Sequence, residues 1–217
     1  MTRPPLMTGT ILAGGLSRRM FDAAGGSGDK GLLALGAVSM IEHVVARVRP
    51  QVGALVLNAN GDASRFAALG LPVVADPIGG FVGPLAGVLA GMRWTAQHHP
   101  SATHTLTVSS DAPFLPHDLV ARLATAVVDA PRVIAVAKSE DGLHPVIGLW
   151  PVQHADDLDA ALKAGMRKVL DWTDRHGTVP VHFPDIVTAA TRIDPFFNAN
   201  TPTELAHARA LLALLTP

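Results

Sequence analysis

The stretch LAGGLSRRM, from Leu12 to Met20, is the most informative part of the sequence for the fold, because it joins the end of a predicted strand to a glycine turn. Residues 10–13 have the short apolar and β-branched composition of a strand, and two glycines follow them. Glycines at a strand end let the backbone come close to a ligand, and the N–H groups of such a turn bind phosphate oxygens. The spacing fits neither the P-loop nor the G-x-G-x-x-G turn. The stretch therefore predicts a phosphate-binding turn of another class, and an ordinary glycine turn with solvated basic residues is the alternative.

Beyond this turn the chain alternates short β-branched runs with longer helical patterns. We predict strands at residues 10–13, 54–57, 71–75, 104–108, 132–138, 145–149 and 178–182, and helices at 40–49, 84–97, 116–130, 155–164, 167–173 and from 202 onward. Two helices begin with capping boxes, Ser39 with Glu42 and Thr201 with Glu204. The alternation predicts an α/β fold, with a three-layer, Rossmann-like, mainly parallel sheet in a single domain of residues 1–217. Ligands bind such sheets at the carboxyl ends of the strands.

The composition narrows the classes of function. The 217 residues are 48% hydrophobic and 16% charged, which is typical of a compact globular domain. A net charge of −1 gives no reason to expect nucleic acid or an anionic membrane as a partner. The sequence has no cysteine, which excludes disulfides and thiolate metal sites, and no apolar run reaches the roughly 20 residues of a membrane span. We expect a cytoplasmic protein.

Charged side chains beyond two of the predicted strands supply the chemistry. Arg19 and Lys30 follow the glycine turn and would neutralise the charge of a bound triphosphate. Asp111 comes directly after the strand 104–108, and a carboxylate there suits Mg²⁺, which takes one or two carboxylates together with phosphate oxygens and water. An aspartate that caps a helix or closes a turn is the alternative. We favour the metal because the phosphate-binding turn accompanies it.

Two further polar residues follow strands that should end at the same edge of the sheet. Asn58 comes after the strand 54–57, and Asp76 after the strand 71–75. An amide and a carboxylate at this edge are suited to reading the edge of a base or a ribose. Because Asn and Asp are also favoured turn residues, a purely structural role is equally compatible with their positions.

Taken together, these motifs resemble the molybdenum cofactor guanylyltransferases, within the broader group of nucleotide-sugar-type transferases. The LAGGLSRRM turn and the segment DKGL at 29–32 are similar to the signature of the broader group. Three later segments narrow the resemblance: GPLAG at 83–87, DAPFLP at 111–116 and FFNANTP at 196–202. The resemblance spans residues 10–212 and implies the nucleotide-diphospho-sugar transferase type of fold.

The resemblance implies an enzyme that transfers GMP from GTP to molybdopterin, giving the guanine dinucleotide form of the cofactor and pyrophosphate. Mg²⁺ would be the metal, and Arg19, Lys30 and Asp111 would be the catalytic residues. The family's nucleotide-binding positions correspond here to Leu12, Ala13, Gly14, Gly15, Lys30, Asn58, Asp76, Gly83, Gly87 and Asp111, of which Asp111 would also hold the metal. The molybdopterin would face Asn198 and Asn200, with its phosphate at Arg167 and Lys168. Other cofactor-biosynthesis proteins and molybdoenzyme chaperones are the protein partners that the resemblance implies.

The sequence departs from the family pattern at two places. The segment FDAAGGSGD at 21–29 is about five residues longer than usual, so Lys30 is expected to reach the phosphates only after this loop closes. Asp111 stands in Asp-Ala-Pro instead of the more usual Asp-Thr-Pro, which removes a hydroxyl and keeps the carboxylate. The rival functions are a cytidylyltransferase acting on the same cofactor, another nucleotidyltransferase of the same fold, and a non-catalytic GTP-binding regulator.

Overall fold

A seven-stranded sheet forms the centre of the molecule in the computed structural model, which describes residues 7–15, 17–21, 28–79 and 83–215. The strand order is β5-β4-β1-β6-β8-β7-β9. The strands are β5 (Val73–Val74), β4 (Ala54–Asn58), β1 (Thr8–Leu12), β6 (His104–Ser109), β8 (Gly142–Pro151), β7 (Ile134–Ser139) and β9 (Thr178–His182). Strands β5, β4, β1 and β6 are parallel neighbours, whereas β8 is antiparallel to both β6 and β7. The sheet is therefore mainly parallel, as predicted, with β8 as its antiparallel strand.

The register of the parallel strands brings the ends of three of them together. Leu12, the last residue of β1, is paired with Asn58 at the end of β4 and with Ser109 at the end of β6. Asn58 is in turn paired with Val74 of β5. The glycine turn, Asn58 and the residues after β6 therefore lie at one edge of the sheet, where the sequence predicted them.

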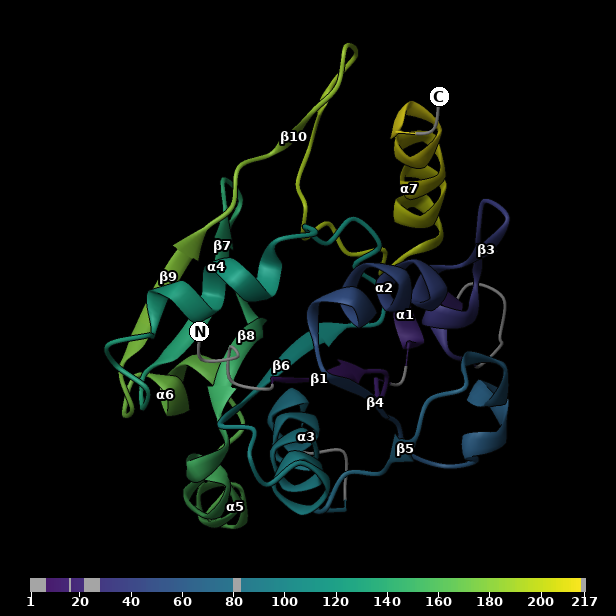
Figure 1. Ribbon diagram of the computed structural model, residues 1–217. Coiled ribbons are helices and arrows are strands. Elements are labelled where there is room, and N and C mark those ends of the chain that lie inside the picture. Colours follow the sequence, from purple (N-terminus) through teal and green to yellow (C-terminus); the bar gives the residue numbers. More distant parts are fainter. Residues whose placement is uncertain (1–6, 16, 22–27, 80–82, 216–217) are drawn as a thin grey trace.

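Helices cover both faces of the sheet and complete the three layers (Figure 1). In this view α2 (Met40–Val48) and α4 (Leu119–Ala126) lie above the sheet, and α3 (Pro84–His98), α5 (Ala155–Lys163) and α6 (Val169–Thr173) lie below it. Helix α2 begins with the predicted capping box, since the N–H of Ser39 donates to Glu42 over 2.7 Å. Short 3-10 helices, η2 (Lys30–Leu32), η3 (Arg49–Gln51), η4 (Ala63–Leu69) and η5 (Val152–His154), connect several of these elements.

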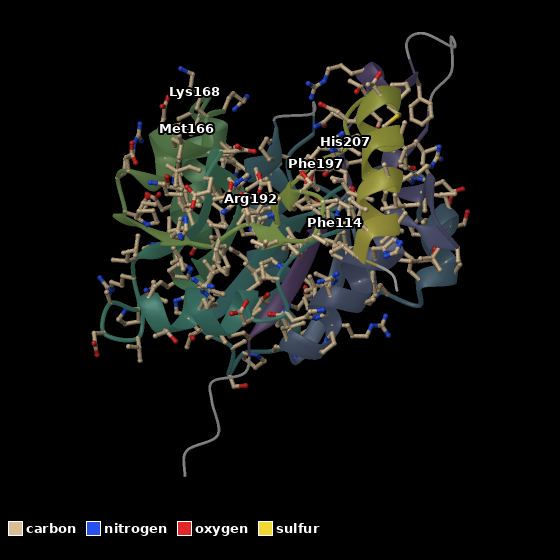
Figure 2. The ribbon with its side chains drawn as sticks, turned by 90° about the horizontal axis from the view of Figure 1, so that it is seen from above. Phe114, Met166, Lys168, Arg192, Phe197 and His207 are labelled. Carbon is tan, nitrogen blue, oxygen red and sulfur yellow. The ribbon has the colours of Figure 1, made fainter. Side chains whose placement is uncertain are left out.

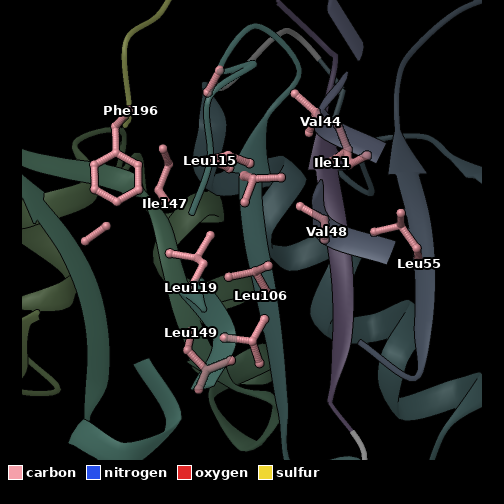
Figure 3. Packing of buried hydrophobic residues seen from close by; sticks show 14 of the residues in the cluster. Ile11, Val44, Val48, Leu55, Leu106, Leu115, Leu119, Ile147, Leu149 and Phe196 are labelled. Atoms are coloured by element: carbon pink, nitrogen blue, oxygen red, sulfur yellow. The ribbon is translucent and has the colours of Figure 1, made fainter. Parts of the chain in front are cut away.

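Two apolar clusters hold the layers together. One lies between the sheet and helices α2 and α4, where Ile11, Val44, Leu106 and Leu119 meet (Figure 3). The other joins α3, α5 and α6 to the opposite face and contains Trp150 and Trp172. Full burial of one large apolar side chain stabilises the fold by about 1.5–3 kcal/mol, so these clusters are the main source of stability.

A third apolar cluster fixes the C-terminal helix α7 (Pro202–Leu215) beside the glycine turn. Its buried residues Leu205, Ala208 and Leu211 pack with Met20 and Phe114. Helix α1 (Arg18–Phe21) supplies Met20 to this cluster. Helix α7 thereby brings residues 196–202, which precede it, to the predicted ligand edge of the sheet.

Several expected boundaries differ from the structure. Helix α4 covers residues 119–126, not 116–130, and β8 begins at Gly142 rather than at residue 145. Two hairpins were not predicted: β2 (Ala34–Leu35) with β3 (Val38–Ser39), and β10 (Ile186–Val187) with β11 (Arg192–Ile193). The capping box predicted at Thr201 is only half formed. The Thr201 hydroxyl accepts the N–H of Glu204, but the Glu204 carboxylate accepts the N–H of Asn200, one residue before the cap.

Within the described ranges no helix combines the length and the apolar character that a membrane crossing requires.

Candidate functional site

A cavity of about 330 Å³ opens at the carboxyl ends of β1, β4, β5 and β6. Every residue predicted to bind the nucleotide lines this cavity, with the exceptions of Asp111 and Arg19. The lining also contains residues for which no role was predicted: Ser17, Asp29, Gly31, Phe66, Pro84, Ser109, Ser110 and Val146. The cavity is therefore built from the glycine turn, the strand ends and the start of α3, as expected for a ligand site in a parallel sheet.

The first residue of the glycine turn is hydrogen-bonded to the sheet, whereas the backbone N–H groups of its two glycines are not paired among the described residues. The N–H of Ala13 donates to the carbonyl of Asn58 over 2.8 Å, which extends the pairing of β1 with β4 by one residue. The N–H groups of Gly14 and Gly15 have no hydrogen-bond partner among the described residues. Ser17 follows with a φ of 50°, in the left-handed region that non-glycine residues seldom adopt. The turn thus offers free backbone donors to an anion at the cavity wall.

Asn58, Asn60 and Asp76 form one hydrogen-bonded group on the next wall. The Asn58 amide donates to Oδ1 of Asp76 over 2.9 Å, and the Asn60 amide donates to Oδ2 over 2.7 Å. The backbone N–H of Asp76 returns a hydrogen bond to Oδ1 of Asn60 over 2.9 Å. The predicted pair is thereby brought together, with Asn60 as a third member that sequence reasoning missed. Its signal was the spacing in Asn58-Ala59-Asn60, because residues two apart on an extended backbone point to the same side.

Glycine is required for different reasons at the two predicted positions at the start of α3. Gly83 caps the helix with a φ of 90°, a conformation that favours glycine. Gly87 lies so close to its neighbours that an added Cβ would collide with Oδ1 of Asn58 and come within 2.7 Å of Cδ2 of Leu12. Gly87 therefore leaves the space that the Asn58 side chain occupies, in addition to lining the cavity.

Lys30, Asp111 and Asn200 meet beside the cavity, although they come from three distant parts of the chain. The ammonium of Lys30 forms an ion pair with Oδ2 of Asp111 and donates to Oδ1 of Asn200 over 2.5 Å. Asp111 is 1% exposed, and its other oxygen, Oδ1, has no hydrogen-bond partner within the described part of the chain. The carbonyl of Asp111 also accepts the N–H of Ala199 over 3.2 Å. Asp111 is thus joined to residues 199 and 200 through both its backbone and its side chain.

Lys30 is fixed independently of the long segment before it. Its N–H donates to the Ser17 hydroxyl over 3.3 Å, and Asp29 accepts from Nε of Arg65 over 2.5 Å. The ring of Phe21 lies against Gly28, where an added Cβ would be 3.1 Å from Cζ. Residues 22–27 lie outside the described part, so the expectation that Lys30 reaches the phosphates only after this loop closes stays a prediction.

The other predicted site residues lie outside the lining of this cavity. Arg19 is exposed on α1. The side chain of Arg167 donates to the carbonyls of Leu162 and Met166, over 2.9 and 2.7 Å, at the end of α5. Its backbone carbonyl lies next to Gly83, 3.8 Å from where a Cβ would be, so this loop borders the cavity.

The residues predicted to face molybdopterin come from two parts of the chain, the loop before α6 and the segment before α7, and Figure 2 labels Lys168 of the first and Phe197 next to the second. Lys168 is exposed at the start of α6, well apart from Phe197 in this view. Asn198 follows Phe197, and its Oδ1 is buried with no hydrogen-bond partner among the described residues. The structure therefore brings Asn200 to Lys30, whereas Lys168 lies apart from Phe197 in this view.

His144, to which sequence reasoning gave no role, supports the segment that carries Asn198 and Asn200. Its Nε2 is 2.8 Å from the Ser139 hydroxyl and 3.7 Å from Oδ2 of Asp194, and its ring packs on Phe196. Burial lowers the pKa of His144, and the nearby Asp194 carboxylate partly opposes this shift. Because both polar contacts are made by the same ring nitrogen, this is not the geometry of a catalytic triad.

The donor set at Asp111 fits a hard divalent cation. The free Oδ1 is a carboxylate oxygen, the kind of ligand that Mg²⁺ and Mn²⁺ prefer. The described residues contain no group of three or more His, Asp or Glu that could hold a metal by themselves. A cation here would therefore have Asp111 as its protein ligand and complete its coordination with water, or with phosphate oxygens once a nucleotide is bound.

The comparisons with known proteins identify the family of the chain. The MobA-like NTP transferase domain family matches residues 9–179. The chain is 48% identical over 207 residues to the molybdenum cofactor guanylyltransferase of Bradyrhizobium sp. (strain ORS 278), and the match covers 95% of this chain and 93% of that protein. The fold resembles that of the molybdopterin-guanine dinucleotide biosynthesis protein A from Archaeoglobus fulgidus, with a TM-score of 0.67 at 22% identity over 95% of this chain and 99% of that one.

A Mycobacterium tuberculosis protein solved in complex with manganese has the same fold, with a TM-score of 0.64 at 18% identity over 94% of this chain and 98% of that one. The fold predicted from the sequence is thus confirmed as that of nucleotidyltransferases. By its domain match and its near-complete alignment with a molybdenum cofactor guanylyltransferase, the chain belongs to the family of MobA-like NTP transferases.

Proposed function

We propose that the protein transfers GMP from GTP to molybdopterin, forming the guanine dinucleotide cofactor and pyrophosphate. Relatives with 42–48% identity over at least 93% of this chain, among them that of Rhizobium meliloti (strain 1021), carry the name molybdenum cofactor guanylyltransferase. The observation that carries the proposal is the position of the Lys30–Asp111 pair beside a cavity lined by the glycine turn. A nucleotide in that cavity would place its phosphates near a lysine and a buried carboxylate, which is the pair that phosphate transfer requires.

The roles of the cavity walls follow from their chemistry. The triphosphate would lie on the free N–H groups of Gly14 and Gly15, with Arg19 and Lys30 supplying positive charge. Asn58, Asp76, Gly83 and Gly87 would surround the base. Both oxygens of Asp76 already accept a hydrogen bond from an asparagine, and each oxygen has a second lone pair. Asp76 can therefore accept from the two adjacent donors that guanine presents on its Watson–Crick edge.

The reaction needs positioning and charge neutralisation rather than a general base. An oxygen of the molybdopterin phosphate attacks the α-phosphorus of GTP, the bond from the α-phosphorus to the β-bridging oxygen breaks, and pyrophosphate leaves with the electron pair. The second pKa of a phosphate monoester is about 6, so the attacking group is already a dianion at neutral pH. The main barrier is the approach of two polyanions, which Lys30 and the backbone donors lower electrostatically.

A divalent cation is part of the same proposal, with Asp111 as its protein ligand and Mg²⁺ as the physiological ion. Its support is the free, buried Oδ1 of Asp111 and the manganese complex of the M. tuberculosis protein with the same fold. A cation bound there would neutralise charge on the phosphates.

The second substrate would lie on the side of residues 196–202. The free Oδ1 of Asn198 is a buried acceptor for an N–H of the pterin, and Arg167 and Lys168 would meet its phosphate. Transfer of the product to other cofactor-biosynthesis proteins or molybdoenzyme chaperones in the cytoplasm completes this proposal.

The test is a pyrophosphate-release assay with each of the four nucleoside triphosphates, with and without molybdopterin. We expect release with GTP that depends on molybdopterin and on Mg²⁺. Preferential release with CTP would overturn the assignment in favour of a cytidylyltransferase. Binding of GTP without any release in the presence of molybdopterin would instead indicate a non-catalytic regulator.

A further inference from the structure

The ammonium of Lys30 is paired with Oδ2 of Asp111, next to the free Oδ1 that would hold a metal. The side chain of Asp111 is 2% exposed, while the side chain of Lys30 is 19% exposed. A carboxylate buried to this degree is strongly destabilised unless a cation accompanies it. Lys30 is the cation that accompanies it.

The same ammonium connects Asp111 to the segment for the second substrate. Oδ1 of Asn200 accepts from Lys30 over 2.5 Å, and the N–H of Asn200 donates to Glu204 over 2.7 Å. With both of these groups engaged, Asn200 has its amide NH₂ left to offer to a ligand. Asn200 therefore binds the ammonium of Lys30, whereas the family resemblance implies only a contact with the pterin.

We propose that Asn200 is a positioning residue for Lys30, and that the two residues together keep Asp111 neutralised until the metal and the nucleotide arrive. This inference rests on the proposed function, because it takes Asp111 as the metal ligand and GTP as the source of the phosphates. When a divalent cation binds Asp111, the ammonium of Lys30 is displaced by charge repulsion and moves to the phosphates in the neighbouring cavity. Its departure frees Oδ1 of Asn200, which becomes an additional acceptor beside Asn198.

This exchange has a consequence for the order of binding. Before nucleotide and metal arrive, Lys30 holds one acceptor of the second-substrate segment, and that acceptor becomes available only after Lys30 has moved. GTP with its metal therefore binds before molybdopterin.

The first experiment measures Mn²⁺ binding to the full chain without nucleotide, by electron paramagnetic resonance, for wild type, Lys30→Met, Asn200→Leu and the double variant. At about pH 8 an unpaired aspartate stays ionised even if its pKa is raised by several units. Removal of a cation next to the site should tighten Mn²⁺ binding by about tenfold or more in Lys30→Met. Asn200→Leu should tighten it by a smaller factor, because Lys30 then loses one of its two acceptors.

The double variant separates a positioning role from a merely structural one. If Asn200 acts through Lys30, then Asn200→Leu has no effect on Mn²⁺ affinity once residue 30 is methionine. Equal effects of Asn200→Leu with and without Lys30 would overturn the positioning role. A Lys30→Met variant that binds Mn²⁺ no more tightly than wild type would overturn the exchange. Asp111→Asn should abolish the signal and so shows that the measured ion is at this site.

These outcomes are independent of the transferase reaction. Mn²⁺ affinity without nucleotide can behave as expected even if the enzyme prefers CTP or a different acceptor, so failure of either proposal is recognised separately. Circular dichroism of each variant checks the fold, and Asn200→Leu alone keeps the proposal testable if Lys30→Met does not fold.

A second measurement tests the release of residues 194–204 by hydrogen–deuterium exchange. In wild type, GTP with Mg²⁺ should raise exchange in this segment, because its connection to Asp111 through Lys30 is broken. In Lys30→Met exchange should already be raised and should not rise further. Unchanged or lower exchange in wild type on addition of GTP and Mg²⁺ would contradict the release of Asn200.

Discussion

Asn60 and Asp76 hold each other in both directions: the Asn60 amide donates to Oδ2 of Asp76 over 2.7 Å, and the Asp76 N–H donates to Oδ1 of Asn60 over 2.9 Å. This reciprocal pair fixes the orientation of a carboxylate that lines the cavity. Asn60 itself does not line the cavity, so its effect on a ligand has to pass through Asp76.

We therefore expect Asn60→Ala to raise the KM for GTP by roughly tenfold, since loss of one hydrogen bond to a charged group costs about 1.5–3 kcal/mol. The value of kcat should change much less, because Lys30 and Asp111 are untouched. Steady-state kinetics with pyrophosphate release measures both constants. A fall in kcat at unchanged KM would assign Asn60 to the chemical step instead.

Asp111→Asn should lower kcat by two or more orders of magnitude, on the order of the loss seen when one electrostatic group of an active site is removed. The amide keeps the size of the side chain and removes its charge, so the loss reflects the cation site rather than packing. The matched control is Asp129→Asn, which changes an exposed aspartate after α4 and should retain full activity. Near-normal turnover of Asp111→Asn at saturating Mg²⁺ would remove the metal from this residue.

Gly87→Ala should destabilise the protein by about 1–3 kcal/mol, the usual cost of an added methyl group in a tightly packed site. The new Cβ would collide with Oδ1 of Asn58, so GTP affinity should fall as well. Gly79→Ala is the control, because no heavy atom of the described residues lies within 4 Å of its added Cβ. Urea denaturation and calorimetric titration with GTP give the two quantities, and equal stability of both variants would show that the Asn58 wall can move aside.

The stability of the fold should fall as the pH is lowered from about 7.5 to about 5.5, around the ordinary pKa of histidine. Burial lowers the pKa of His104, and also that of His144, so both take up protons at a lower pH in the folded chain than in the unfolded chain. Their stabilising contribution is therefore present above the ordinary histidine pKa and is lost as the pH falls below it.

Replacement of His104 isolates one part of this effect. His104→Asn should make the loss of thermal stability between these pH values smaller, with the remainder due to His144. His117 is exposed, and His117→Asn should leave the dependence as it is in wild type. The pH dependence is measured by thermal unfolding. An unchanged slope in His104→Asn would show that the pKa of His104 does not differ between the folded and the unfolded chain.

The residues at the sheet edge could be predicted because strand order constrains them. Parallel strands present their carboxyl ends at one edge, so the glycine turn, Asn58, Asp76 and Asp111 could be assigned to one region without knowledge of any contact. The structure confirms this placement for the cavity lining and puts Asp111 just beside it. The strength of the prediction came from topology and not from the identity of the side chains.

The contact of Lys30 with Asn200 could not be predicted, since 170 positions separate the two residues in sequence. The path of residues 194–200 depends on how α7 packs on Met20 and Phe114, which no local pattern encodes. The hairpins β2–β3 and β10–β11 were missed for a different reason. Their strands have two residues each, too few to display an alternation of apolar and polar side chains.

Contacts among the described residues hold both ends of the long segment at 21–29. Phe21 packs on Gly28, and Arg65 fixes Asp29, so the geometry at Lys30 is decoupled from the number of residues between positions 21 and 28. Doubling the length of a loop whose ends are already adjacent costs only about 0.6 kcal/mol. This makes the segment a permissive insertion site, at which an epitope or a fluorescent peptide should report on the enzyme while GTP affinity, measured by calorimetry, stays that of the parent chain.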